Sequence, residues 1–306
     1  MLSPVPRCSA APAAVPRRWF RCVSQHMGRR FHCMDTAVHD LAMDTYTHGH
    51  AEPVLQSHRW RTAENSAPHL LPHLRPGLDL LDVGCGPGTI TVDLARRVAP
   101  GRVVGLDVSP DPLDEARAAA GRAGVAVEFA VGDTYALEAA DDSFDVVHAH
   151  QVLQHLNDPV AALREMARVC RPGGVVAVRD VDYATFTWFP ADRGLDRWLE
   201  VYYGVARAND AEPDAGRRLL SWAHAAGLRD VVTTTSSWCY ATPEEREWWG
   251  TSWAGRATAS AFADQALAYG LATPEELDDL AAAWLRWAAA DDGWLGMMHG
   301  ELLIRV

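Results

Sequence analysis

The sequence contains no lysine, so all 28 of its basic side chains are arginine. Aspartate and glutamate together number 40, and the formal net charge at pH 7 is -12. A protein that neutralises nucleic-acid phosphates needs clustered positive charge, so this balance argues against a nucleic-acid partner. The chain also lacks an apolar run of about 18 residues, the length that a membrane-spanning helix needs, and no membrane span is indicated.

Cysteine is scarce, with six residues scattered along the chain and none at C-x-x-C or zinc-type spacing. With 306 residues, 48% of them hydrophobic, the chain has enough core to fold without disulfides. We therefore expect reduced thiols, a cytoplasmic location and no metal site.

The first 42 residues differ in composition from the remainder. They hold six arginines but only Asp35 and Asp40 as acids, several prolines and no apolar periodicity. A secretory hydrophobic segment is missing. We interpret residues 1–42 either as a disordered tail or as a non-native extension that precedes the true start at Met27, Met34 or Met43; an arginine-rich targeting segment is the alternative.

Three glycines at alternate positions mark the most informative stretch, residues 80–91. A short apolar run ends in Gly84, Gly86 and Gly88, and an apolar-periodic segment follows at once, which predicts a strand, a tight turn and a helix. Glycine permits positive φ and lets a ligand approach the backbone closely. The N-terminus of the helix then offers free N–H groups to that ligand.

The glycine spacing does not fit a dinucleotide-binding fingerprint. In G-x-G-x-x-G the sixth place is glycine, and here it is Thr89. Asp82 stands two places before Gly84, where a carboxylate would repel a pyrophosphate but would suit an ammonium or sulfonium group. A nicotinamide oxidoreductase on a related fold is therefore disfavoured.

Further short apolar strands follow in order, and several end in polar residues. They are predicted at 103–107, 125–131, 144–149, 175–178, 230–236 and 294–306, the last antiparallel at the sheet edge. Helices predicted at 111–123 and 159–170 alternate with strands, which indicates a mostly parallel, doubly wound sheet. Ligands of such sheets bind beyond the carboxyl ends of the strands, where Asp82, Asp107, Asp133 and His150 should meet.

This succession over roughly residues 45–183 resembles the class I S-adenosylmethionine (SAM)-dependent methyltransferases, and is most similar to the ubiquinone/menaquinone-biosynthesis type. The resemblance implies an α/β, Rossmann-like, doubly wound seven-stranded sheet with SAM as cofactor. It also implies that Asp107 accepts from the ribose hydroxyls, that Asp133 accepts from the adenine amino group, and that the main chain at His150 contacts the amino-acid portion. The predicted cofactor-binding residues are Asp82, Gly84, Cys85, Gly86, Gly88, Asp107, Val108, Asp133, Thr134, His150, Gln151, Tyr46 and Arg59.

Residues 43–76 are predicted to form a helical segment that lies over the cofactor. Its candidates for the SAM carboxylate or the acceptor are Tyr46, His50, His58, Arg59 and Arg61. The two arginines fit a bidentate grip on a carboxylate best.

The remaining chain, residues 77–306, is predicted to be the methyltransferase domain with a helical cap inserted at about 243–290. Ten of the twelve tryptophans follow Tyr183, and a tryptophan-rich lid suits a flat or apolar acceptor. His155 follows the fourth strand and is the candidate general base. We therefore expect methyl transfer to O or C of a small aromatic or apolar molecule; a SAM-binding regulatory or scaffold protein without turnover is the alternative. The residues do not predict the oligomeric state.

Overall fold

The computed structural model describes residues 44–49 and 51–306. The predicted extension at 1–42 and the candidate His50 lie outside the described residues. The described part from residue 44 onward belongs to one compact unit.

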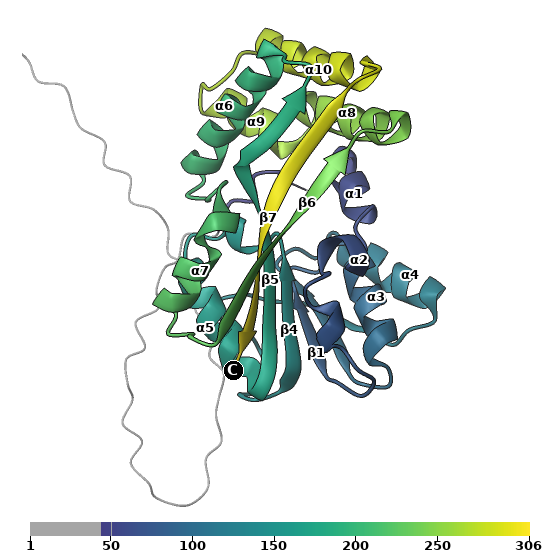
Figure 1. Cartoon of the computed structure of the whole chain (residues 1–306), viewed down its shortest axis with the longest axis vertical. Coiled ribbons are helices and arrows are strands. Elements are labelled where there is room, and N and C mark those ends of the chain that lie inside the picture. The colour runs from purple at the N-terminus through teal and green to yellow at the C-terminus, as the bar shows by residue number, and fades with distance from the viewer. Residues whose placement is uncertain (1–43, 50) are drawn as a thin grey trace, which may run out of the picture. The chain divides into compact units, whose positions relative to one another are not determined.

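Within this part of the chain, seven strands form one sheet in the spatial order β3-β2-β1-β4-β5-β7-β6 (Figure 1). Strands β1 to β5 pair in parallel, and β7 runs antiparallel to both of its neighbours. The strands are β1 (Leu80–Val83), β2 (Val103–Asp107), β3 (Glu128–Val131), β4 (Phe144–His150), β5 (Cys170–Phe189), β6 (Val231–Tyr240) and β7 (Trp294–Arg305). The predicted fold class, a Rossmann-like and mostly parallel seven-stranded sheet, is confirmed.

The strand predicted at 294–306 is antiparallel, as expected, but it does not lie at the edge of the sheet. β7 lies second from the edge, between β5 and β6, and β6 is the edge strand. The burial of the strands agrees with this order. Nearly every residue of β7 is buried, as expected for a strand with partners on both sides, whereas β3 and β6 at the two edges are largely exposed.

Helices cover both faces of the sheet. Neighbouring strand residues point to opposite faces: Leu80 packs in a core with α2 and α3, whereas Leu81 packs in a second core with α5 and α7. The helices are α1 (Glu52–Arg59), α2 (Ala63–Ser66), α3 (Thr89–Val98), α4 (Leu113–Ala123), α5 (Pro159–Val169), α6 (Arg193–Ala208), α7 (Ala215–Ala225), α8 (Pro243–Thr258), α9 (Ala261–Ala268) and α10 (Pro274–Ala289), with short 3-10 turns η1 (Leu71–His73) and η2 (Leu153–His155).

A third core lies beyond the parallel half of the sheet. Strands β5, β6 and β7 extend past the other strands, and α6, α8, α9 and α10 pack on their far ends (Figure 1). We call these four helices the aromatic layer, because their core is rich in tryptophan and tyrosine. The predicted cap at 243–290 contains α8, α9 and α10 but leaves out α6. It also leaves out the continuation of β5, which was predicted only at 175–178.

In the described residues, no helix combines the length and the apolar character that crossing a membrane requires.

Candidate functional site

The loop after β1 has the backbone that its glycines predict. Gly84, Gly86 and Gly88 have φ of 68°, 54° and 77°, and Gly88 is the N-cap residue of α3. A Cβ on Gly84 would lie 2.4 Å from Val152 Cγ2, so a side chain there has no room. On Gly86 the nearest atom would be His58 Nδ1 at 3.9 Å. The loop therefore presents bare backbone toward the N-terminal segment.

Asp82 fixes the position of this loop relative to the strands. Its carboxylate accepts a hydrogen bond from the Thr91 hydroxyl and lies 2.7 Å from His148 Nδ1, and the residue is only 2% exposed. These contacts join β1 to the first turn of α3 and to β4. Asp82 thus orients the loop, and its predicted contact with a cationic ligand stays a prediction.

The next two strand ends carry the other predicted acids. Asp107 accepts hydrogen bonds from the N–H groups of Gly86 (2.9 Å) and Ser109 (3.0 Å), which fixes its carboxylate beside the glycine loop. Asp107 lies opposite Val131 in the β2–β3 register, so the segment Gly132–Thr134 follows at the same edge of the sheet. Val108 and Asp133 are exposed there and Thr134 is half-buried. The structure therefore brings the residues predicted to contact ribose and adenine to the carboxyl end of the same two strands.

Cys85 is buried within the loop. Burial raises the pKa of its thiol far above the usual range, and the carboxylates of Asp82 and Asp107 raise it further. The thiol is therefore protonated at neutral pH, as expected of a small filler residue and not of a nucleophile.

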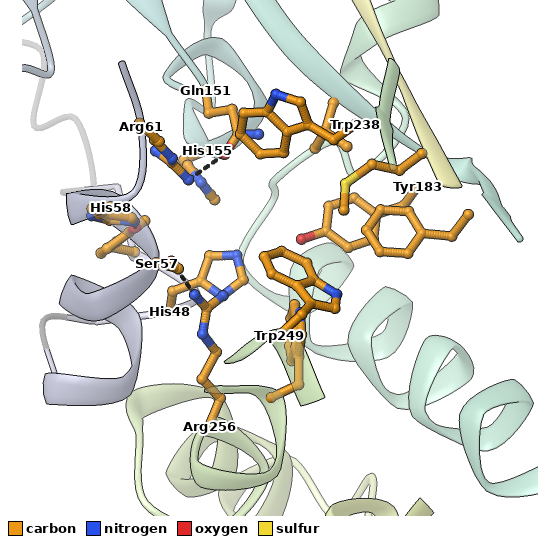
Figure 2. Close-up of a pocket in the computed structure, with 15 residues that line it drawn as sticks. His48, Ser57, His58, Arg61, Gln151, His155, Tyr183, Trp238, Trp249 and Arg256 are labelled. Carbon is orange, nitrogen blue, oxygen red and sulfur yellow. Dashed lines mark hydrogen bonds between the residues drawn. The ribbon is translucent and has the colours of Figure 1, made fainter. Parts of the chain in front are cut away.

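A partly open cavity lies close to the glycine loop, and Figure 2 shows the side chains that line it. His58 connects the two: its ring lies nearest to Gly86, and its carbonyl oxygen accepts from the Thr89 hydroxyl. The cavity lies between the N-terminal segment, the ends of the long strands and α8. Its lining residues are Tyr46, His48, Ser57, His58, Arg61, Gln151, His155, Val181, Tyr183, Phe186, Trp238, Trp249, Trp253, Arg256 and Met297.

Three of the predicted site residues, Tyr46, Gln151 and His155, line this cavity. His150 does not: its ring is buried beside Trp238 and His299, with centroid distances of 5.7 Å and 6.3 Å. Burial, followed by the charges of nearby arginines, lowers the pKa of His150 well below its usual value, so this ring is neutral.

Arg59, which was predicted to bind the cofactor, does not line the cavity. Its guanidinium donates to Glu52 and to Glu115 (2.6 Å) on the exposed side of α1. Because α1 ends at Arg59, the chain turns there and Arg61 faces inward. Of the two arginines predicted to grip a carboxylate, Arg61 is the one that lines the cavity.

Arg61 is fixed by Gln151. Its guanidinium donates to Gln151 Oε1 at 2.6 Å, and Gln151 itself has a φ of 55° directly after β4. Burial lowers the pKa of Arg61 to about 10, so the group remains cationic at neutral pH. A positive charge thus stands where the end of β4 meets the glycine loop.

His155 is poorly matched to the role of general base. Burial and then the charge of Arg61 lower its pKa to about 3, and its Nε2 lies 2.8 Å from Gln154 Nε2. Proton abstraction is most efficient when the pKa lies near the working pH. Burial raises the pKa of Tyr46 and of Tyr183 to about 12, so both hydroxyls keep their protons.

Sequence reasoning did not include Arg256, Tyr183 or Trp238 among the site residues. Arg256 comes from α8, where it follows Trp249 and Trp253 at positions i, i+4 and i+7 of one helix face. This spacing was visible in the sequence, and an arginine on an otherwise aromatic stripe is the signal that would have identified it. Trp238 comes from the edge strand β6, and no local pattern in the sequence links it to the glycine loop.

The cavity wall contains no aspartate or glutamate among the described residues that line it. Nor do the described residues include a group of three or more His, Cys, Asp or Glu arranged to hold a metal ion. The polar groups that face the cavity are histidine, tyrosine, glutamine, serine and arginine side chains.

Comparison with known proteins agrees with this architecture. The family described as a methyltransferase domain matches residues 81–178. A ubiquinone/menaquinone biosynthesis C-methyltransferase of Bdellovibrio bacteriovorus is 35% identical over 117 residues, which cover 38% of this chain and 50% of that protein. The YcgJ protein from Bacillus subtilis has a similar fold, with a TM-score of 0.53 at 19% identity over 79% of this chain and 98% of its own.

The broadest of these similarities spans nearly the whole relative. An uncharacterized methyltransferase of Schizosaccharomyces pombe is 34% identical over 282 residues, which cover 85% of this chain and 96% of that protein. The resemblance expected from the sequence is thereby confirmed, and the chain belongs to the methyltransferase family.

Proposed function

We propose that the protein transfers the sulfonium methyl group of SAM to an oxygen or carbon of a small aromatic or apolar acceptor, which loses a proton, and that S-adenosylhomocysteine is released. The observation that carries this proposal is the bare glycine loop, with Asp107 fixed beside it, next to a cavity with aromatic walls. Cofactor and acceptor would then meet where the loop, His58 and Gln151 adjoin.

The residues present fit SAM. The open space at Gly86 admits a ligand against the backbone, and the fixed carboxylate of Asp107 suits a vicinal diol. Val108, Asp133 and Thr134 would flank the adenine at the exposed end. Tyr46, Gln151 and Arg61 would face the amino-acid portion, with Arg61 on its carboxylate. When bound, SAM supplies an electrophilic methyl group.

The chain's own contribution to the reaction is position and exclusion of water. Trp249, Trp253 and Tyr183 form flat walls that would align an aromatic acceptor with the methyl carbon. The aromatic layer closes the far side of the cavity, away from the glycine loop. In a water-poor site, the charges of the cavity act more strongly on bound groups than they would in solvent.

Calorimetric titration with SAM tests the cofactor assignment. We expect Asp107→Ala to weaken binding by about 1–3 kcal/mol, because a hydrogen-bonded partner of the ribose is lost. Asp114→Ala, on the exposed face of the neighbouring α4, is the matched control and should bind normally. Unchanged affinity in folded Asp107→Ala protein would remove the ribose assignment.

Turnover of methyl-labelled SAM against phenols, quinols and activated carbon acids tests the reaction. Transfer of label to O or C of one of these supports the proposal. Tight SAM binding with no transfer to any of them would favour the regulatory or scaffold alternative. Binding of NAD in place of SAM would favour an oxidoreductase.

A further inference from the structure

Two arginines of the cavity have no acidic partner in the part of the chain that the structure describes. Among the described residues, Arg61 and Arg256 take part in no ion pair, although most arginines of the structure do. Arg256 is 4% exposed, donates one side-chain hydrogen bond to Ser57 Oγ, and has a buried Nε without a partner. Figure 2 shows Arg61 and Arg256 entering the cavity from different elements, α8 carrying Arg256 and the chain after α1 carrying Arg61.

This arrangement is energetically unfavourable without a ligand. Removing a guanidinium from water is costly unless an opposite charge and full hydrogen bonding compensate it. The chain has 40 acidic residues, yet none of those described lines the cavity. The faces of Trp253 (4.7 Å to the ring centroid) and Trp249 (6.0 Å) compensate the charge of Arg256 only in part.

The two arginines face different parts of the site. Arg61 is bonded to Gln151 at the carboxyl end of β4, close to where the proposed function places the amino-acid portion of SAM. Arg256 projects from α8 beside Trp249 and Trp253, on the side formed by the aromatic layer. One positive charge is therefore assigned to the cofactor, and the other is left for a second ligand.

We propose that the methyl acceptor is an aromatic carboxylate, or an equivalent planar oxyanion, and that Arg256 holds its negative charge. This inference rests on the proposed function and specifies its substrate class. The planar guanidinium offers parallel N–H donors that match a carboxylate, with the Ser57 hydroxyl beside it. Trp249, Trp253 and Tyr183 supply the flat walls for the aromatic part.

Matched ligand pairs test the charge requirement directly. The protein is saturated with S-adenosylhomocysteine, and benzoate, 1-naphthoate and indole-3-acetate are titrated calorimetrically against benzamide, 1-naphthamide and indole-3-acetamide. We expect at least one acid to bind about tenfold or more tightly than its amide, the scale of a charge-assisted hydrogen bond. If no acid binds better than its amide, the inference is wrong.

Replacement of Arg256 tests whether this residue recognises the negative charge of the ligand. Arg256→Gln should remove the preference for the acid and leave the affinity for S-adenosylhomocysteine unchanged. Arg286→Gln removes the same charge from the exposed surface of α10 and should keep the preference. A preference that persists in Arg256→Gln would overturn the assignment to this residue.

Thermal unfolding gives an independent measurement. Because Arg256 is buried without an acid, Arg256→Met should unfold at the same or a higher temperature than the wild type. The preferred acid should raise the midpoint of the wild type but not of the variant. If Arg256→Met does not fold, Arg256→Lys is the second variant, because lysine keeps the charge without the planar guanidinium. Its preference for the acid over the amide should be weaker than that of the wild type but not lost. A preference equal to that of the wild type would contradict bidentate recognition.

The outcomes also separate this inference from the proposed function. Loss of all binding by SAM and S-adenosylhomocysteine in the wild type would contradict the cofactor assignment. Normal cofactor binding with equal affinity for acids and amides would contradict only the anionic acceptor.

Discussion

Asp180 is a buried carboxyl group with an incomplete set of partners. It lies fully buried on β5; its Oδ1 accepts from the Gln154 N–H at 3.1 Å, and its Oδ2 has no hydrogen-bond partner among the described residues. Burial raises its pKa to about 7, while the hydrogen bond and Arg179 act in the opposite direction. At neutral pH this carboxyl group is therefore partly protonated in the folded protein.

We predict that Asp180→Asn stabilises the protein at pH 8 and has little effect at pH 5. A folded-state pKa above the ordinary value of about 4 means that the folded state binds more protons, so the wild type loses stability as pH rises from about 4 to about 7. Asparagine keeps the hydrogen-bond acceptor without the charge. The gain at pH 8 should be at least about 1 kcal/mol, or about 2 °C in thermal midpoint. Asp278→Asn, exposed on α10, is the control, and an equal change at both pH values would contradict the prediction.

His155 provides a second test at the level of one residue. A general base contributes about 10²- to 10⁴-fold to the rate. Since the pKa of His155 lies near 3, we expect His155→Asn to lower kcat by less than about tenfold and to leave the pH profile between 6 and 8 unchanged. A larger loss, with disappearance of an acidic limb from the profile, would restore His155 as the base.

At the scale of the elements, tryptophan packing holds the aromatic layer together. Trp284 of α10 lies edge-on to Trp198 of α6 at 4.8 Å, and Trp198 lies edge-on to Trp253 of α8 at 4.6 Å. Trp253 and Trp284 stack at 5.8 Å with an interplanar angle of 14°. Three helices therefore share one buried aromatic contact, and one of its rings, Trp253, also forms the cavity wall.

We predict that Trp284→Ala destabilises the protein by about 3–5 kcal/mol, the usual loss for truncating a fully buried aromatic side chain. Trp284 does not line the cavity, so the effect belongs to packing. Urea unfolding measures it, and Trp294→Ala, which removes a ring that is 41% exposed, should change the free energy of unfolding by less than about 1 kcal/mol. Equal losses in the two variants would show that the aromatic layer is not a cooperative core.

The sequence predicted the parallel half of the sheet well and the far half poorly. Local signals, such as the glycines after β1 and the acid that ends β2, place strands and turns without any tertiary information. β5 was predicted at four residues because its buried middle, Ala177–Tyr183, shows no alternation of apolar and polar residues. Its length depends on pairing with β7, more than a hundred residues later in the chain, as the pair Val178 and Leu302 illustrates.

The candidate site also has a part that could be predicted from the sequence and a part that could not. The glycine loop and Asp107 could be predicted because the residues that shape them are close in sequence. Arg256 lies on a helical aromatic stripe that the sequence does show, but its partner Ser57 is 199 residues away and no local pattern links the two. Arg59 and Arg61 were both predicted to fit a carboxylate, and the sequence does not show where α1 ends, which decides that Arg61 faces the cavity.

For the whole molecule, α1 is the connection between the glycine loop and the aromatic layer. At its C-terminal end, the His58 carbonyl accepts from the Thr89 hydroxyl at 3.2 Å. At its N-terminal end, the Pro53 carbonyl accepts from the Ser252 hydroxyl of α8 at 2.8 Å. A ligand that orders the loop should therefore also stabilise α8, although α8 is remote from β1 in the sequence.

Hydrogen exchange tests this coupling. We predict that SAM slows amide exchange in α8 as well as in residues 84–91, with about 1 kcal/mol of added protection in the helix. Ser252→Ala removes the hydrogen bond to Pro53 and should keep the protection of the loop while reducing that in α8, which stays joined to α1 by the hydrogen bond from Arg256 to Ser57. Thr251→Ala is the matched control, because the Thr251 hydroxyl donates only to carbonyls of its own helix. If Ser252→Ala and Thr251→Ala respond alike, the signal reaches α8 by another route, through the ligand in the cavity and not through α1.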